Sequence, residues 1–364
     1  MKLFLFFIIF YSSLSLSDDF INYAYDQKLG QTDVLIAIKN NKIIFENYSN
    51  GYSFKSPHKL HSLSKLYLSL FIAREEYLGR INSRAPIFPF SSNYFEKNIT
   101  LESLMRMSSG LRTVYDQEAM EKIKFSLLRP IESELISRSD NYLQKSLPMF
   151  FPNTSFNYSF NDNNLLLIYL DEKYSNFHNL ISNFINSDLS LNATTFEYSI
   201  NPQMFFHDEH SFLGELIKKY NREQSFRIYP AMQFAQSSPE DLIKVANIFL
   251  NKGLVKGKSF ISSEWVLRSF SYNPKSFENS YKAKSYFAKF TYGMFWFLNK
   301  PFPNGKRPYP DLPSDLVLIQ GLRGQTLAIF PSENAIYLRL ANDPLKSQFD
   351  REKHLTIFYN QFLK

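Results

Sequence analysis

The stretch that decides the fold is HKLHSLSKLYLSLFIAREEYLG, residues 58–79. After Ser62 and Lys65 the residues are apolar on almost every side, which predicts a helix buried in a core rather than one lying on a surface. Gly79 stands where a helix C-terminus is expected. Lys65 breaks the local rule, because a helix N-terminus carries positive partial charge and favours Asp or Glu. A broken rule without visible compensation indicates a functional site.

Ser62 and Lys65 are three residues apart, so on a helix they share one face with Cβ atoms about 5–6 Å apart. A lysine in apolar surroundings loses solvation of its charged form, which favours the neutral amine. Such an amine could take the hydroxyl proton of Ser62 and make it a nucleophile. The backbone N–H groups of the helix N-terminus could then stabilise an oxyanion. The alternative is that Ser62 caps the helix while Lys65 extends into water.

The same spacing occurs once more nearby, at Ser56 and Lys59. Only the Ser62 copy is followed at once by a long apolar helix, so the context separates the two.

The chain begins MKLFLFFIIFYSSLSLSDDF. Lys2 precedes a short apolar run, and Ser15 and Ser17 are small residues at the −3 and −1 positions of a cleavage site. We interpret residues 1–17 as a cleaved signal peptide; a buried first strand is the alternative. The run is too short to span a bilayer as a helix, and no later stretch is apolar enough, so no transmembrane anchor is expected.

The chain of 364 residues contains no cysteine and has a formal net charge of +7. The absence of cysteine excludes disulfides, thiolate metal sites, a cysteine nucleophile and a lipid anchor on cysteine, and fits a bacterial envelope protein. The charges are dispersed, without the basic runs that indicate nucleic-acid binding. We expect no nucleic-acid partner. The mild positive excess could favour an anionic envelope surface or substrate, but a solvated basic surface is the favoured interpretation.

Strand patterns cluster at the two ends of the chain. Residues 33–49 predict a hairpin turning at Asn40-Asn41, and four strand patterns follow between residues 292 and 342, before a final helix over residues 350–363. Helices are expected over residues 100–110, 161–174 and 238–253. The order predicts an α+β fold with one antiparallel sheet built from both chain ends, flanked by helices, and a large, mostly helical insertion. Within a single domain over residues 18–364, the α/β part covers about 20–80 and 285–364, and the helical part about 81–284.

Several common catalytic motifs are absent from the sequence: G-x-S-x-G, G-x-G-x-x-G, the Walker loop and H-E-x-x-H. His207 and His210 form the one histidine cluster, but no third ligand is identifiable, so a polar loop is favoured over a metal site. We therefore predict neither a metal nor a cofactor.

The chain also resembles a known family, through ordered segments that match in content and spacing. The segments are HSLSKLYLSLFIAREEYLGRINSRAPI (61–87), ITLESLMRMSSGL (99–111), FPNTSFNYSFNDNNLL (151–166), YPAMQFAQSSPEDLIKVANIFLNKG (229–253), KSFISSEWV (258–266), YGMFWF (292–297) and GLRGQTLAIFPSENAIYLRLAN (321–342). Together they resemble the serine β-lactamase-related superfamily, which includes class C β-lactamases, DD-peptidases, family VIII esterases and 6-aminohexanoate-oligomer hydrolases. The resemblance runs from about residue 33 to 342 and implies a β-lactamase/transpeptidase-like fold.

The resemblance also implies roles for individual residues. Ser62 would be the acylated nucleophile and Lys65 its general base. Tyr158, at the tyrosine of the family's Y-x-N motif, would share proton transfer with Lys65. Gly321 occupies the glycine of the family's K-T-G motif, so the backbone N–H groups of Ser62 and Leu322 would form the oxyanion hole.

The positions where the resemblance places substrate contacts depart from the family pattern. Phe160 stands where the Y-x-N asparagine is expected, with Asn161 one residue later. The K-T-G segment reads Ile319-Gln320-Gly321, so an apolar residue replaces the Lys or His that helps to bind a substrate carboxylate in penicillin-recognising enzymes. Arg323 could supply charge nearby. The departures argue against efficient β-lactamase or DD-peptidase activity, and the closing strands with Arg339 resemble the aminohexanoate-type amide hydrolases most.

The sequence thus predicts an exported bacterial serine hydrolase, periplasmic or secreted. It would cleave an ester or amide bond of a small-molecule or peptide-like substrate through an acyl-enzyme on Ser62. One alternative is a non-catalytic or weakly active, penicillin-binding-like protein that recognises the cell wall. The other is a true DD-peptidase or β-lactamase.

Overall fold

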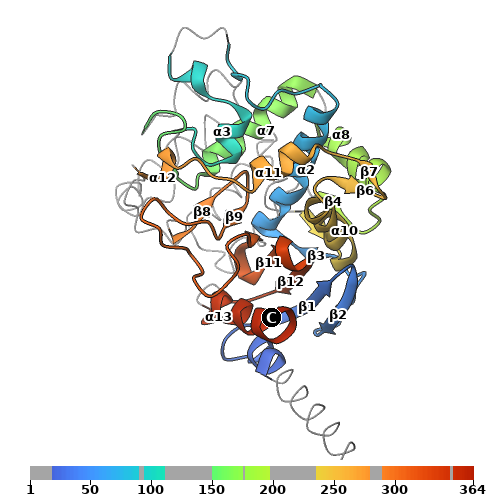
Figure 1. Cartoon of the computed structure of the whole chain (residues 1–364). Coiled ribbons are helices and arrows are strands. Elements are labelled where there is room, and N and C mark those ends of the chain that lie inside the picture. The colour runs from blue at the N-terminus through green and yellow to red at the C-terminus, as the bar shows by residue number, and fades with distance from the viewer. Residues whose placement is uncertain are drawn as a thin grey trace, which may run out of the picture.

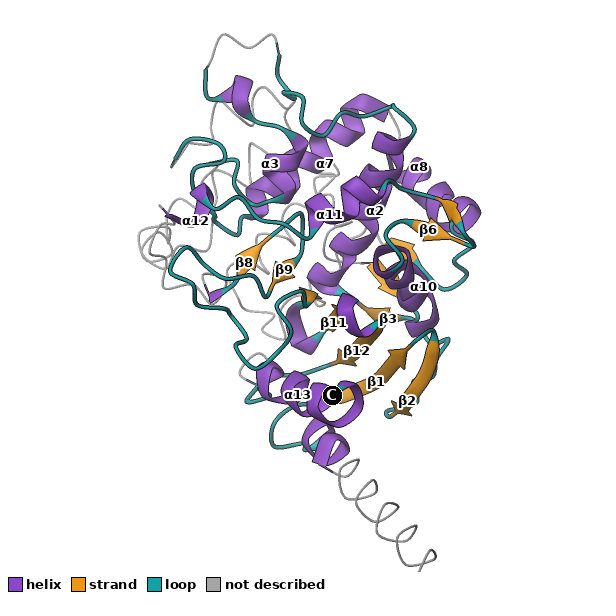
Figure 2. Ribbon diagram, viewed as in Figure 1, coloured by secondary structure: helices purple, strands orange, loops and turns teal. Residues whose placement is uncertain are grey.

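The computed structural model describes residues 19–89, 94–110, 150–174, 177–196, 235–278, 289–344 and 347–364. Figures 1 and 2 show a sheet at one end of these residues and a group of helices at the other. The predicted signal peptide lies outside the described residues, as do His207 and His210. Within the described part of the chain, no helix combines the length and the apolar character needed to cross a membrane.

A seven-stranded antiparallel sheet organises the fold, with the strand order β2-β1-β12-β11-β10-β9-β8. Its strands are β1 (Thr32–Lys39), β2 (Lys42–Tyr48), β8 (Thr291–Tyr292), β9 (Phe297–Leu298), β10 (Val317–Gln320), β11 (Thr326–Phe330) and β12 (Ala335–Ala341). The first strand pairs with the last, with Leu35 opposite Arg339. The sheet is therefore built from both chain ends, as the sequence predicts.

The hairpin between β1 and β2 turns at the predicted pair of asparagines. Asn40 and Asn41 have φ angles of 53° and 59°. Positive φ at both central residues defines the type I′ turn, which matches the twist of two-residue hairpins and which asparagine tolerates. The turn leaves β2 at the edge of the sheet and β1 buried between neighbours.

Helices cover both faces of the sheet (Figure 1). On one face, α13 (Arg351–Phe358) and a helical segment at residues 19–25 pack through aromatic rings. Tyr337 of β12 contacts Phe20 and Phe358 there, with ring centroids 6.4 Å and 5.3 Å away. On the other face, α10 (Pro239–Leu250) contacts β11, β12 and α2 (Lys65–Tyr77).

The helix α2 is buried on nearly every side, as its sequence predicts. Gly79 follows it with φ of 72°, and its N–H donates to the carbonyl oxygen of Glu76 (2.9 Å). A glycine in this left-handed conformation is a common helix C-terminus. The helix α10 also begins as expected, because the side chain of Ser238 accepts a hydrogen bond from the N–H of Asp241.

The remaining helices lie mostly in the middle of the chain. They are α3 (Leu101–Met105), α7 (Phe160–Tyr174), α8 (Phe177–Asn183), α11 (Ser263–Ser269) and α12 (Lys275–Glu278). Short strands accompany them: β3 (His58–Lys59), β4 (Thr195–Phe196), β5 (Ala235–Ser237), β6 (Leu254–Val255) and β7 (Lys258–Ser259). In Figure 2, α3, α7 and α11 lie together at the end of the molecule opposite α13.

Two elements differ from the sequence prediction. The helix expected over residues 100–110 stops at Met105, because Met107 adopts φ of 53°. Residues 292–297 form a tight hairpin rather than one strand, since the N–H of Gly293 donates to the carbonyl oxygen of Trp296 (2.8 Å). Both differences come from backbone conformations that apolar periodicity does not reveal.

Candidate active site

Ser62 lies in a 3₁₀ turn, His61–Ser64, which joins the short strand β3 to α2. The strand is fixed by its pairing with β5, and the N–H of Leu60 donates to the carbonyl oxygen of Ala235 (3.0 Å). His61 has φ of 50°, an uncommon conformation for a residue with a side chain. Such strained positions cluster at functional sites. The sharp turn places Ser62 at the entrance of α2.

Lys65 is the first residue of α2, and its Nζ lies 3.0 Å from Ser62 Oγ. Only 1% of Lys65 is exposed, so its amine does not reach bulk water. The N-cap position of α2 is Ser64, whose side chain makes no capping hydrogen bond. The structure therefore contradicts the alternative in which Ser62 caps the helix and Lys65 extends into solvent.

Tyr158 faces Lys65 across the site. The ring centroid of Tyr158 lies 5.5 Å from Lys65 Nζ, and 8% of the residue is exposed. Its ring packs against Tyr292 (centroids 5.9 Å apart, edge to face) and Phe297 (6.2 Å, stacked). Aromatic neighbours on β8 and β9 thus fix the ring orientation of Tyr158.

The backbone that carries Tyr158 is anchored just before α7. The N–H of Asn157 donates to the carbonyl oxygen of Met107 (2.8 Å), and the N–H of Phe156 donates to that of Ser276 (2.9 Å). Two segments that are distant in the sequence therefore hold the backbone next to this residue. They place Tyr158 next to a helix that begins almost a hundred residues earlier in the chain.

Asp162, which the sequence analysis did not single out, is a buried carboxyl group in the first turn of α7. Its Oδ1 accepts a hydrogen bond from Ser109 Oγ (2.5 Å). Burial raises the pKa of Asp162 to about 8, although the bonds from Ser109 oppose the shift. Burial, Tyr158 and Asp162 also raise the pKa of Tyr292. An acidic residue in a first turn usually only complements the helix dipole, so the sequence held no signal of this burial.

The turn between β10 and β11 lies against the segment that leads to Ser62. A Cβ atom on Gly321 would overlap the carbonyl oxygen of Leu60, so only glycine allows this approach. The N–H of Gly321 donates to the carbonyl oxygen of Gln325 (2.9 Å) and closes the turn. Leu322, the predicted oxyanion residue, directly follows this contact, and 48% of it is exposed.

Ile319 and Gln320 point to opposite faces of the sheet, because strand side chains alternate. The Oε1 of Gln320 accepts a hydrogen bond from Arg351 Nη1 (3.1 Å), which places Gln320 on the α13 face. Ile319 therefore lies on the opposite face, where α10 packs, and it is 1% exposed. The position that holds a cation in the family motif is thus occupied by a buried apolar side chain.

Of the other predicted substrate residues, Arg323 lies close enough to His61, the neighbour of Ser62, for its charge to act on that ring. Arg323 has φ of 59°, and its Nη1 donates to Asn342 Oδ1 (2.9 Å) just after the end of β12. Phe160 and Asn161 lie in the first turn of α7, and their side chains are outside the described part of the structure. Their predicted roles in substrate binding stay predictions.

His61, next to Ser62, is uncharged at neutral pH. Burial lowers the pKa of His61 to about 4, and the positive charge of Arg323 acts in the same direction. In the part of the chain that the structure describes, no group of three or more His, Cys, Asp or Glu side chains could hold a metal ion.

The geometry supports acyl-transfer chemistry. A hydroxyl group, a buried amine at hydrogen-bond distance and a tyrosine beside that amine are the parts of a serine–lysine hydrolase site. A family model matches the chain over residues 25–359, and this model is that of the Beta-lactamase family. The chain therefore belongs to the Beta-lactamase family, whose members are serine hydrolases. The predicted β-lactamase/transpeptidase-like fold is confirmed.

Solved structures with the same fold include several hydrolases. EstCE1, a hydrolase with promiscuous acyltransferase activity, has 12% identity and a TM-score of 0.67, with 97% of this chain and 100% of that chain covered. A class C β-lactamase from Rhodobacter sphaeroides has 16% identity and a TM-score of 0.58, with 96% of this chain and 97% of that chain covered. A D-stereospecific amidohydrolase from Streptomyces sp. has 14% identity and a TM-score of 0.59, again with 96% and 97% covered. No curated protein matches the chain significantly.

Proposed function

We propose that the protein is an exported serine hydrolase that cleaves an ester or amide bond through an acyl-enzyme on Ser62. The observation that carries the proposal is the distance of 3.0 Å between Lys65 Nζ and Ser62 Oγ, with Lys65 buried. A lysine held there has no solvent to pair with, and the serine hydroxyl is its hydrogen-bond partner. This is the arrangement that a serine nucleophile and its base require.

In the proposed reaction, the amine of Lys65 takes the proton of Ser62 while Ser62 Oγ attacks the substrate carbonyl carbon. The resulting oxyanion is bound by the backbone N–H groups of Ser62 and Leu322. Collapse of the tetrahedral intermediate breaks the ester or amide bond, and the proton passes to the leaving group. A water molecule then attacks the carbonyl carbon of the acyl-enzyme while Lys65 takes a proton from it. The bond to Ser62 Oγ breaks, Oγ receives the proton, and the acid is released.

Tyr158 would take part in these proton transfers. Its position beside Lys65 allows the phenol to relay the proton between the amine and the leaving group. The rings of Tyr292 and Phe297 keep Tyr158 in this position. We infer that Tyr158 protonates the leaving group.

The proposed substrates are esters or amides without a carboxylate next to the scissile bond. Ile319 is apolar and buried on the face of the sheet opposite α13, so this strand position offers no cation to a substrate carboxylate. We therefore favour an esterase or amidase over an efficient β-lactamase or DD-peptidase.

Export to the periplasm or the exterior is proposed from residues 1–17 alone. A fusion of these residues to a reporter that is active only after export, expressed in a bacterium, tests it. Export should be lost when charged residues interrupt the apolar run.

The proposed activity is tested by labelling the mature protein with a fluorophosphonate probe and mapping the adduct by mass spectrometry. Ser62 should carry the adduct, and Ser62→Ala should lose both the label and the hydrolysis of a short p-nitrophenyl ester. Labelling of another residue, or equal labelling of Ser62→Ala, overturns the proposal. Binding to peptidoglycan without turnover of any ester or amide would favour the non-catalytic alternative instead.

A further inference from the structure

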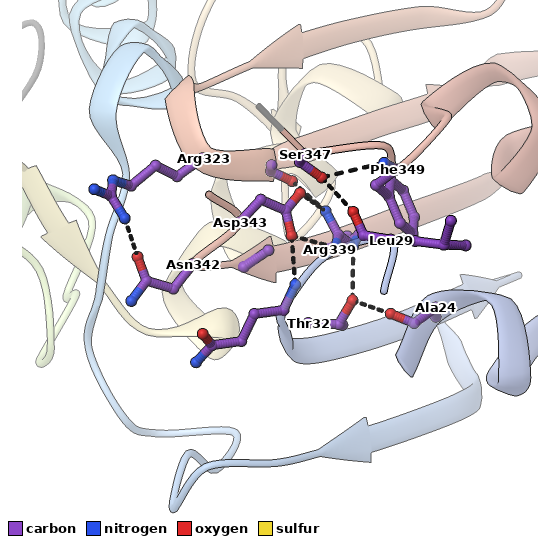
Figure 3. A network of polar contacts seen from close by, with 12 residues as sticks. Ala24, Leu29, Thr32, Arg323, Arg339, Asn342, Asp343, Ser347 and Phe349 are labelled. Carbon is purple, nitrogen blue, oxygen red and sulfur yellow. Dashed lines mark hydrogen bonds and ion pairs between the residues drawn. The ribbon is translucent and has the colours of Figure 1, made fainter. Parts of the chain in front are cut away.

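A buried ion pair between Arg339 and Asp343 lies directly behind the β10–β11 turn (Figure 3). Arg339 Nη1 lies 2.8 Å from Asp343 Oδ2, and Nη2 lies 2.8 Å from Oδ1. Arg339 is fully buried, and 4% of Asp343 is exposed. A bidentate pair of this kind fixes the relative position of the two groups as well as their separation.

The ion pair is joined to the turn by two hydrogen bonds. Arg339 Nη1 donates to the carbonyl oxygen of Gly324 (3.2 Å), and the N–H of Asp343 donates to that of Arg323 (3.1 Å). A Cβ atom on Gly324 would overlap both Arg339 Nη1 and Asp343 Oδ2. The backbone of the turn therefore rests directly on the two charged groups.

The pair itself is anchored to the first strand. Arg339 Nε donates to Thr32 Oγ1 (2.9 Å), and the N–H of Gln31 donates to Asp343 Oδ1 (2.7 Å). The guanidinium carbon of Arg339 also lies 3.6 Å from the ring centroid of Phe349. Figure 3 shows these contacts converging on the pair from separate segments of the chain. The turn is thereby fixed to β1 and to the segment before α13.

The opposite side of the turn meets the nucleophile segment. Gly321 lies against the carbonyl oxygen of Leu60, two residues before Ser62. Leu322 lies between this contact at Gly321 and the two residues, Arg323 and Gly324, whose carbonyl oxygens are bound by Asp343 and Arg339. The direction of its N–H therefore depends on anchors on both sides of the turn.

We propose that Arg339 and Asp343 are positioning residues that hold the Leu322 N–H where it and the Ser62 N–H bind the same oxyanion. A buried ion pair adds little net stability, because removing both charges from water costs about as much as their attraction returns. What this ion pair contributes is that it holds the β10–β11 turn in a single arrangement. The inference rests on the proposed function, because the oxyanion forms only during acyl transfer.

The expected signature of this role is a loss of kcat with little change in KM, because the oxyanion exists only in the transition state. For Asp343→Asn and for Arg339→Lys we expect kcat on a p-nitrophenyl ester to fall roughly 10- to 100-fold, somewhat less than when an oxyanion donor is removed outright. KM should stay within about threefold of the wild-type value. The affinity for a boronic acid that mimics the tetrahedral intermediate should fall in parallel with kcat/KM. Lysine keeps the charge but loses the bidentate geometry, so Arg339→Lys tests geometry alone.

The control removes another ion pair, which is partly exposed and lies away from the turn. Glu76 and Arg268 are 2.6 Å apart, and Glu76 follows Lys65 by eleven residues along α2, about 16 Å at the helix rise. Glu76→Gln should lower the urea midpoint as Asp343→Asn does, while leaving kcat and boronic acid affinity unchanged. The two readouts separate lost stability from lost positioning.

Two outcomes count against the inference. Folded Asp343→Asn and Arg339→Lys proteins with wild-type kcat and boronic acid affinity would overturn it. A rise in KM at constant kcat would also overturn it, because it would indicate a role in substrate binding. Failure of the proposed function is seen separately, in a wild-type protein that neither turns over the ester nor labels at Ser62. If Asp343→Asn does not fold, Arg339→Lys decides alone.

Discussion

Lys65 Nζ lies 3.0 Å from Ser62 Oγ, in a position that leaves only 1% of Lys65 exposed. The turn that carries Ser62 explains this closeness. In a 3₁₀ turn the side chains of residues i and i+3 are almost superimposed along the axis, whereas in an α-helix they are offset. Ser62 stands in such a turn and Lys65 begins the α-helix that follows, so the local backbone brings the two groups together.

The first prediction concerns Lys65. Lys65→Ala should lower kcat/KM for a p-nitrophenyl ester by about 10²–10⁴-fold, the range for loss of a general base. Lys59→Ala is the matched control, because Lys59 ends the other S-x-x-K copy and its side chain is exposed. It should leave the kinetics unchanged. A similar loss in both variants would mean that the distance between Lys65 and Ser62 has no catalytic meaning.

The second prediction concerns Tyr158. Tyr158→Phe keeps the ring that packs against Tyr292 and Phe297 but removes the hydroxyl group, so stability should change little while kcat falls by about 10²-fold or more. Amide substrates should suffer more than activated esters, since p-nitrophenolate leaves without being protonated. Tyr169→Phe, a half-buried tyrosine on α7, is the control and should match the wild type. Equal losses on esters and amides would argue against a role in leaving-group protonation.

The elements that the sequence predicted correctly are those whose signals are local. The hairpin at Asn40-Asn41, the buried helix α2 and the capped helix α10 each carry their own turn, periodicity or cap. The closeness of Ser62 and Lys65 is local too, so their spacing offered it as a hypothesis, and the resemblance to the family favoured it over the alternative in which Ser62 caps the helix.

What the sequence could not reveal depends on contacts between distant residues. Arg339 donates to Thr32, 307 positions earlier, and no periodicity or motif encodes that bond. The burial of Asp162 likewise depends on Ser109, which lies 53 positions away. The placement of Gln320 on the α13 face is shown by its hydrogen bond from Arg351, which lies 31 positions later in the chain. Long-range polar contacts of this kind complete the surroundings of the site.

The third prediction concerns substrate charge. Because Ile319 is apolar and buried, the wild-type protein should hydrolyse a neutral p-nitrophenyl ester at least about 100-fold more efficiently than a chromogenic cephalosporin, which carries a carboxylate. A neutral ester and a matched ester with an added carboxylate isolate the effect of the charge. If the carboxylate improves kcat/KM, another cation recognises it, and Arg323→Ala would then identify or exclude that residue.

The last prediction concerns stability against pH. Asp162 has a pKa of about 8 in the folded protein, against 3.8 for an aspartate in water, so between pH 4 and 8 the folded state holds a proton that the unfolded state has lost. Stability from this group therefore falls as pH rises through that window, by at most about 1.4 kcal/mol per pH unit. His354, whose pKa burial lowers to about 3, acts with the opposite sign, because its unfolded state gains a proton below pH 6.5. The two groups have opposite effects on the free energy of unfolding below pH 6.5. The decrease caused by Asp162 can therefore be measured between pH 6.5 and 8.

Urea unfolding at half-unit steps from pH 6.5 to 8 measures this slope. Asp162→Asn should flatten it and leave the variant more stable than the wild type at pH 8, since an amide keeps a hydrogen bond to Ser109 without an ionisable proton. Ser109→Ala supplies a second variant. It removes a bond that opposes the shift, so the downward slope should extend above pH 8. If the wild-type slope is unchanged in Asp162→Asn, Asp162 is ionised in the folded protein and the environment described for it is wrong.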